Sequence, residues 1–74
     1  MEQRLIAVVA AALGVPTSAL KLETGPGDLE EWDSMGQINV VSEVEGEFGV
    51  NIPIEKISEI RSIRDFLPYL EKTS

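Results

Sequence analysis

Residues 33–49 read DSMGQINVVSEVEGEFG, and this stretch predicts a helix. Successive residues of a helix lie about 100° apart, so one set of side chains shares an arc of about 100° that faces the core. That set consists of Gln37, Val40, Val41, Val44 and Phe48. Asp33 or Ser34 can cap the free backbone N–H groups, and Gly49 stands where a left-handed conformation ends a helix. We therefore predict a helix over residues 34–48.

Three other segments fit around this helix. Strong helix formers dominate residues 3–13 and Gly14 ends the pattern, which predicts a first helix. Residues 15–33 are rich in turn formers and predict a long connection, which a small protein has to pin with apolar side chains. The expected pins are Leu20, Leu22, Leu29 and Trp32. Pro53 can begin a short helix over residues 54–57.

A fourth helix is expected near the end of the chain. Ser62 and Asp65 have the spacing of a capping box, and Pro68 should bend or end the regular hydrogen bonding near residues 64–67. The apolar positions of this helix are Ile63, Phe66, Leu67 and Leu70. No segment has a strand pattern. We expect one all-α domain over residues 1–74, a four-helix bundle with three longer helices, one short helix and a long first loop.

The composition excludes several classes of function. The 74 residues include neither His nor Cys, which rules out disulfides, the usual zinc ligands, imidazole bases and thiol nucleophiles. We find no pair of groups suited to catalysis and no calcium-loop pattern, so we expect neither an enzyme nor a metal site. The net charge of −7 would repel nucleic acid and anionic lipid. Between Leu22 and Glu55 there is no Lys or Arg, and a basic partner surface is the natural complement.

The apolar run near the start of the chain does not predict a membrane span. It covers residues 5–15 apart from Gly14, well short of the roughly 20 residues that cross a bilayer. Arg4 before an Ala-rich segment resembles a signal peptide, but Glu2 offsets its charge and cleavage near Ala12 would remove much of the core. We expect a cytoplasmic monomer.

Several motifs of this chain occur together in one family. They are Trp32-Asp33-Ser34-Met35, a helix with Val40, Val44 and Phe48 inward, the run EVEGEFGV over residues 43–50, and Ile52-Pro53. In these features, over nearly its whole length, the chain resembles the acyl carrier protein family, in which Asp-Ser-Leu opens the second helix. Met35 stands in place of that Leu, a change of similar volume.

The resemblance implies a covalent cofactor. Ser34 would be joined by a phosphodiester to 4′-phosphopantetheine, with Asp33 and Met35 completing the attachment motif. The thiol of that group would hold an acyl intermediate as a thioester, which the carrier shuttles between enzymes. A helix N-terminus suits the new phosphate because free N–H groups and the helix dipole favour negative charge there. The implied partners are a phosphopantetheinyl transferase, an acyl-loading ligase or transferase, and downstream synthase or acyltransferase enzymes.

Two sets of side chains are candidates for docking these partners. Met35 and Ile38 lie outside the core arc, so both are candidates for an exposed apolar surface. We expect Met35 to be exposed, whereas Ile38 could equally be covered by loop or fourth-helix residues. Carboxylates on the second helix meet basic partner patches in the resembled family. Here they are Glu43, Glu45 and Glu47, and we favour a docking role for them over a merely solvated face.

Three residues depart from the common fatty-acid type. Gly36 and Asn39 replace acidic residues, and Trp32 replaces a small or aliphatic one. This favours a carrier of a specialised pathway, such as polyketide synthesis, over primary fatty acid synthesis. A peptidyl or aminoacyl carrier is the close alternative, although such carriers more often read Gly-Gly-His-Ser where Asp33-Ser34 stands. An unmodified acidic helical adaptor for basic proteins is a further alternative.

Gln37 is the one polar member of the core arc, one turn from Ser34. Carriers of the fatty-acid type often hold a long acyl chain between helices near this region. An amide without partners is unfavourable there, so we hypothesise a short or polar cargo, or a long chain left exposed. Gln37 would hydrogen-bond to the first loop or line the pocket entrance, or else point outward beside Trp32 with no role.

Overall fold

The computed structural model describes residues 2–71. Within that range the fold is all-α and contains four α-helices, two 3₁₀ turns and no strand. The elements are α1 (Glu2–Leu13), η1 (Thr17–Ala19), α2 (Ser34–Phe48), α3 (Ile54–Ile57), η2 (Ile63–Phe66) and α4 (Leu67–Glu71). The predicted all-α class and the predicted bounds of the first three helices are confirmed, with α1 one residue longer than expected.

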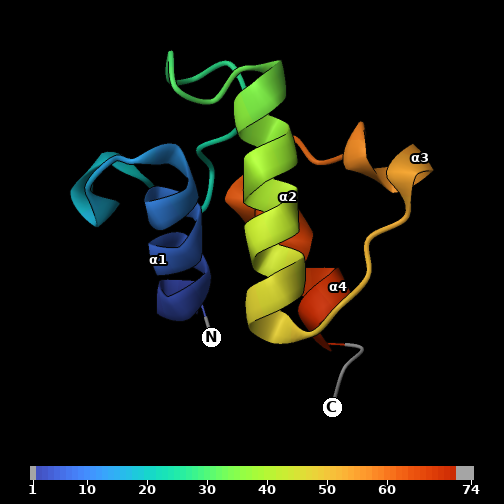
Figure 1. Ribbon diagram of the computed structural model, residues 1–74. Helices are drawn as coiled ribbons and strands as arrows, with labels where there is room; N and C mark the ends of the chain where they lie inside the picture. Colours follow the sequence, from blue (N-terminus) through green and yellow to red (C-terminus); the bar gives the residue numbers. More distant parts are fainter. Residues whose placement is uncertain (1, 72–74) are drawn as a thin grey trace.

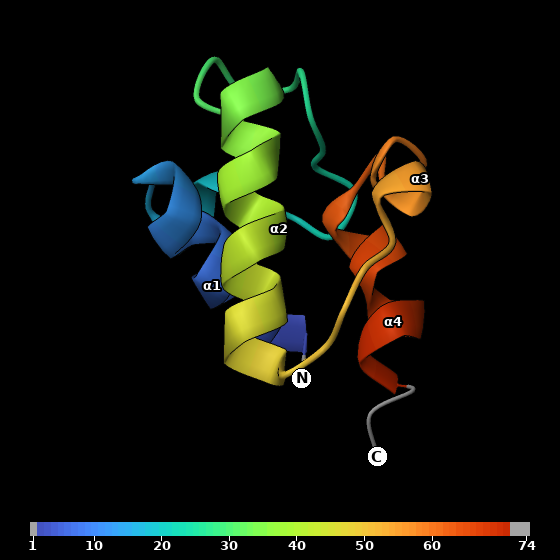
Figure 2. The same ribbon diagram turned by 45° about the vertical axis from the view of Figure 1, so that its right-hand side comes forward.

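The long helix α2 stands at the centre and the other elements surround it (Figure 1). Helix α1 runs antiparallel to α2 and packs directly against it. After Gly49 the chain turns back and carries α3 to the level of the N-terminal half of α2 (Figure 2). Gly49 adopts the left-handed φ of 66° that the sequence pattern predicts for it. No helix in residues 2–71 is long and apolar enough to span a membrane.

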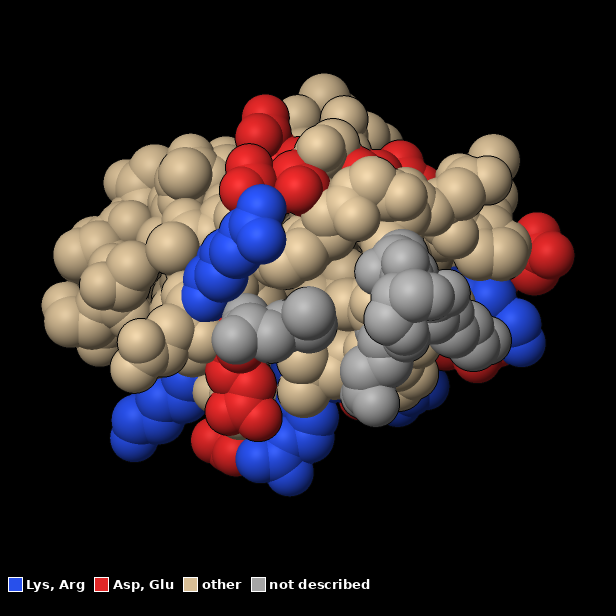
Figure 3. Space-filling model, turned by 90° about the horizontal axis from the view of Figure 1, so that it is seen from below, with Lys and Arg blue, Asp and Glu red and all other residues tan. Residues whose placement is uncertain are grey.

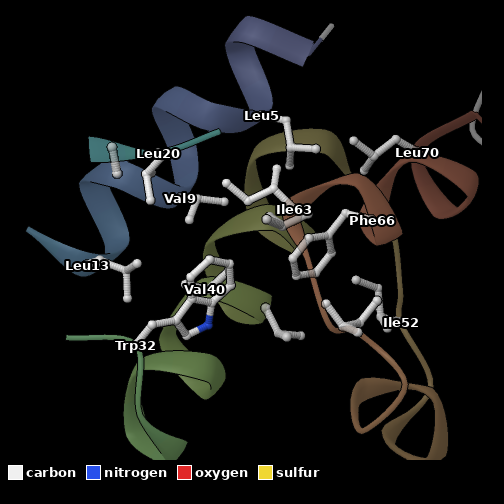
Figure 4. Packing of buried hydrophobic residues seen from close by; sticks show 14 residues of the cluster. Leu5, Val9, Leu13, Leu20, Trp32, Val40, Ile52, Ile63, Phe66 and Leu70 are labelled. Carbon is white, nitrogen blue, oxygen red and sulfur yellow. The ribbon is translucent and has the colours of Figure 1, made fainter. Parts of the chain in front are cut away.

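The core is one apolar cluster of buried side chains. The first loop and all helices except α3 contribute to it. Figure 4 shows Trp32 at one end of the cluster and Leu5 and Leu70 at the other. Trp32 has no exposed surface and Leu20 is also buried, while Leu22 and Leu29 are half-buried against the cluster. The predicted pinning of the long connection is therefore confirmed.

The end of the chain differs from the sequence prediction. Instead of one helix with a capping box, η2 leads into α4, and the Ser62 side chain makes no capping hydrogen bond. The backbone N–H groups of Ile63 and Arg64 donate instead to carbonyls of the first loop, at 2.9 Å each. The Asp65 carboxylate accepts from the Arg61 N–H at 2.8 Å. The capping-box prediction is wrong because another part of the chain supplies the acceptors that the cap would have provided.

Pro68 falls at the second residue of α4, where regular hydrogen bonding changes from 3₁₀ to α. A proline in the first turn of a helix is tolerated because its missing N–H would have no partner within the helix there. The predicted interruption of the regular pattern near Pro68 is confirmed.

Candidate functional site

Ser34 is the first residue of α2, and its side chain is exposed. The preceding Asp33 is the N-cap, and its Oδ1 accepts a hydrogen bond from the Gly36 N–H at 2.9 Å. The sequence left open whether Asp33 or Ser34 caps the helix, and the structure assigns that role to Asp33. No residue between 2 and 71 hydrogen-bonds to the Ser34 hydroxyl. This hydroxyl is therefore accessible to a modifying enzyme.

Gly36 fixes how the first loop meets the start of α2. It is buried, and a Cβ built at this position would collide with the backbone carbonyl oxygen of Glu31 and lie 3.2 Å from Cδ2 of Leu13. A glycine is required because loop backbone packs directly on the first helical turn. In the sequence, Gly36 was notable only as a departure from the fatty-acid type, and its close packing was not predicted.

An open groove of about 870 Å³ begins beside Ser34. Its walls come from the end of the first loop, the N-terminal half of α2, and α3 with the residues after it. The lining residues are Pro26, Gly27, Trp32, Asp33, Ser34, Gln37, Ile38, Ile54, Ile57, Ser58 and Ile60. Most of these side chains are apolar, so the groove is suited to an apolar group attached at Ser34.

Gln37 lies within this groove and is half-buried. Its Oε1 accepts a hydrogen bond from Nε1 of Trp32 at 2.7 Å, and its Nε2 donates to the carbonyl oxygen of Ile57 at 3.4 Å. Both alternatives that give Gln37 a role hold: it hydrogen-bonds to the first loop and lines the pocket. The outward-pointing alternative is wrong, because the indole N–H of the buried Trp32 needs an acceptor.

Three large apolar side chains beside the site are exposed: Met35 (67%), Ile38 (60%) and Ile54 (83%). The predicted exposure of Met35 is confirmed. For Ile38 the sequence left exposure and cover open, and the structure shows that it is exposed. Ile54 was not predicted as a surface residue. The exposure of Ile54 could have been predicted from the length of the short helix, since four residues cannot bury apolar side chains on both faces.

The three carboxylates expected to dock partners have different surroundings. Glu43 is exposed, and no residue in the described part of the chain pairs with its carboxylate. Glu45 accepts a hydrogen bond from the Ile52 N–H at 2.7 Å, and Glu47 pairs with Arg4 at 2.8 Å. Glu43 and Glu47 are about 40° apart around the helix, whereas Glu45 is about 160° from Glu43. The three carboxylates therefore do not share one face of α2.

Basic and acidic side chains alternate at the end of the molecule opposite Ser34. Figure 3 views this end, where Lys and Arg side chains lie beside Asp and Glu rather than apart from them. Arg4 contributes to this mixture, because its guanidinium pairs with Glu47 and lies 4.9 Å from the ring centroid of Phe48. These contacts tie the start of α1 to the end of α2.

Comparison with known proteins establishes the family. A family model described as "Phosphopantetheine attachment site" matches residues 3–70. The chain belongs to the acyl carrier protein family. An acyl carrier protein of Phaeodactylum tricornutum is 38% identical over 69 residues, which are 93% of this chain and 91% of the relative. Acyl carrier proteins of Rickettsia bellii strains RML369-C and OSU 85-389 are 26% and 25% identical over 97% of this chain, and over 84% and 89% of their own lengths.

Family membership establishes the cofactor and the general role. Acyl carrier proteins are carriers rather than enzymes, and their cofactor is covalently bound phosphopantetheine. Members of the family interact with a phosphopantetheinyl transferase and with synthase enzymes. The residues around Ser34 fit such a group, because its exposed hydroxyl, to which no residue from 2 to 71 hydrogen-bonds, stands at a helix N-terminus beside an apolar groove.

Proposed function

We propose that this protein holds an acyl intermediate as a thioester on phosphopantetheine attached to Ser34 and shuttles it between enzymes. The observation that carries the proposal is the Ser34 hydroxyl, which is exposed and without a hydrogen-bond partner among residues 2–71, at the start of α2. When bound, phosphopantetheine supplies the thiol that this chain, with no Cys, lacks.

Attachment requires only a hydroxyl from this chain. A transferase removes the Ser34 proton, and Oγ forms a bond to the phosphorus of coenzyme A nearest the pantetheine. The bond from that phosphorus to the bridging oxygen breaks, and adenosine bisphosphate leaves. Asp33 holds the first turn of α2 in place by accepting the Gly36 N–H, which presents Ser34 at a fixed position. The dipole of α2 and its free N–H groups favour the resulting phosphodiester charge.

We further propose a partner surface around the attachment residue. Met35, Ile38 and Ile54 supply exposed apolar area, and Glu43 supplies negative charge that a basic enzyme surface complements. Glu45 and Glu47 are also candidates, although each already has a partner within the chain. The partners are a transferase, an acyl-loading enzyme and a downstream synthase or acyltransferase of a specialised pathway, and a cytoplasmic location fits this set.

Intact-mass measurement after incubation with a transferase and coenzyme A tests the attachment. We expect the wild-type protein to gain one phosphopantetheine and Ser34→Ala to gain none. Ser34→Ala should remain folded because Asp33, not Ser34, caps α2. Ser42→Ala is the matched control, since Ser42 is another exposed serine of α2 and its loss should leave modification unchanged.

Two results would contradict the proposal. Modification of a folded Ser34→Ala variant would move the attachment to another residue. A wild-type protein that stays unmodified with several transferases, and also when isolated from cells, would favour the acidic adaptor.

A further inference from the structure

The side-chain amide of Gln37 joins three parts of the molecule that meet in the groove. The chain has one Trp, and its indole N–H donates to Gln37 Oε1 at 2.7 Å. On the other side Gln37 Nε2 reaches the carbonyl oxygen of Ile57, the last residue of α3, at 3.4 Å. One amide thus connects the first loop, α2 and α3, and we call these three groups the Gln37 bridge.

The Gln37 bridge joins walls of the groove close to Ser34. Trp32, Gln37 and Ile57 all line the groove, and α2 and α3 form two of its walls. Gln37 is three residues after Ser34, which is roughly 4.5 Å farther along the helix axis. An alkyl chain that entered the groove between α2 and α3 from the Ser34 end would therefore meet the bridge within about one helical turn.

The two hydrogen bonds of the bridge differ in strength. The bond from the indole is short and its donor is fully buried, so breaking it would leave a buried N–H without an acceptor. The bond to Ile57 is longer than the 2.7–3.2 Å usual for such pairs, so it is the weaker of the two. An alkyl chain that separated α3 from α2 would break this weaker bond and leave the amide N–H against hydrocarbon, which is unfavourable.

We propose that Gln37 determines the length of the cargo by closing the groove beyond the first turn of α2. Short acyl groups stay outside the bridge, where a hydroxyl or carbonyl on the cargo can accept from Gln37 Nε2. Long alkyl chains are not taken up between α2 and α3. This inference rests on the proposed attachment at Ser34 and adds the substrate class.

The test compares short and long cargo on the same carrier. A transferase that accepts acyl-coenzyme A attaches acetyl-, hexanoyl- or decanoyl-phosphopantetheine in one step, and intact mass verifies each product. Two properties are then measured for every form: the thermal midpoint of unfolding and the fluorescence of Trp32. Trp32 lines the groove and is the one Trp of the chain, so its emission reports directly on the presence of an alkyl chain there.

For the wild-type protein we expect the same midpoint and the same emission with all three acyl groups. A chain that is not taken up adds no stabilising contacts to the folded state. In Gln37→Leu the groove loses its polar barrier, and the midpoint should rise with chain length, by roughly 4 °C or more from acetyl to decanoyl. The Trp32 emission of this variant should change over the same series.

Two further variants separate specificity from stability. Gln37→Met has a volume close to that of Gln, removes both hydrogen bonds and serves if Gln37→Leu does not fold. Gln3→Leu makes the same substitution at an exposed position of α1, and its midpoints should stay independent of chain length. A purely structural role of Gln37 would lower the midpoints of all acyl forms equally and leave the difference between them unchanged.

Each adverse result has a distinct meaning. A wild-type midpoint that rises strongly with chain length would overturn the inference, and so would folded Gln37→Leu and Gln37→Met variants that show no such rise. In both cases the masses would still report acylation at Ser34, and the proposed function would stand. A wild-type protein that gains no mass would overturn the proposed function and this inference together.

Discussion

The missing Cβ at Gly36 lets the carbonyl of Glu31 lie directly against the first turn of α2. Two residues earlier, Ser34 is exposed at the edge of the groove. The difference comes from the direction in which each residue points, since Gly36 faces the loop and Leu13 whereas Ser34 faces solvent. A tight contact at Gly36 thus holds the start of α2 while the nearby Ser34 hydroxyl stays exposed.

This contact predicts opposite effects for two glycines of α2. Gly36→Ala should lower the free energy of unfolding by about 1–3 kcal/mol, because the Glu31 carbonyl has to move away from the new methyl group. Gly46→Ala is the matched control: a Cβ there meets nothing within 4 Å, and Ala is the better helix former, so we expect a gain of about 0.5–1 kcal/mol. Urea denaturation measures both, and equal effects would show that the Gly36 contact carries no energy.

Different parts of the α2 surface have different roles. One face packs Val40, Val41 and Val44 into the core, while its N-terminal turns present Ser34 and the groove. Its C-terminal half carries acidic side chains, and two of them contact other segments of the chain. Glu45 fixes the turn to Ile52 by accepting its N–H, and Glu47 pairs with Arg4 of α1. Glu43 is the carboxylate of this half that no described residue engages.

Charge reversal at Glu43 therefore tests docking without disturbing the fold. If α2 meets a basic partner surface, Glu43→Lys should slow association with the transferase several-fold at low ionic strength. Added salt should bring the two rates together, because exposed charges are screened. Stopped-flow measurements over a salt series check this, with Glu2→Lys on α1 as the control for net charge. Equal rates at low salt would mean that Glu43 is merely solvated.

At the scale of the whole molecule, the first loop and η2 complete each other. The loop carbonyls of Leu22 and Thr24 accept the N–H groups that begin η2, and Arg64 pairs with Glu23 across the same contact. Gly25 allows this approach, since a Cβ there would collide with the Arg61 carbonyl oxygen. The loop is thereby part of the packed structure and holds Trp32 under α2, one residue before the cap of the functional helix.

Truncation of two isoleucines, the buried Ile63 and the exposed Ile54, should change the free energy of unfolding by different amounts. Ile63 is fully buried in η2, and Ile63→Ala should cost about 2–5 kcal/mol, which leaves so small a protein largely unfolded. Ile54 is 83% exposed, and Ile54→Ala should change the free energy of unfolding by no more than about 0.5 kcal/mol. Circular dichroism during urea denaturation gives both values. A large loss from Ile54→Ala would assign that side chain to the fold rather than to partner docking.

Local sequence patterns were sufficient to predict the helices α1, α2 and α3 and the candidate attachment motif. Periodicity and end signals located α1, α2 and α3, and Asp33-Ser34-Met35 marked the start of α2. The tertiary structure alone decided which acceptors begin η2, why Gly36 is a glycine and where Gln37 places its amide. Each of these depends on segments distant in sequence: loop carbonyls replaced the Ser62 cap, and Ile57 became a partner of Gln37 from 20 positions away. Helical periodicity describes one element at a time, whereas burial and hydrogen bonding are settled between elements.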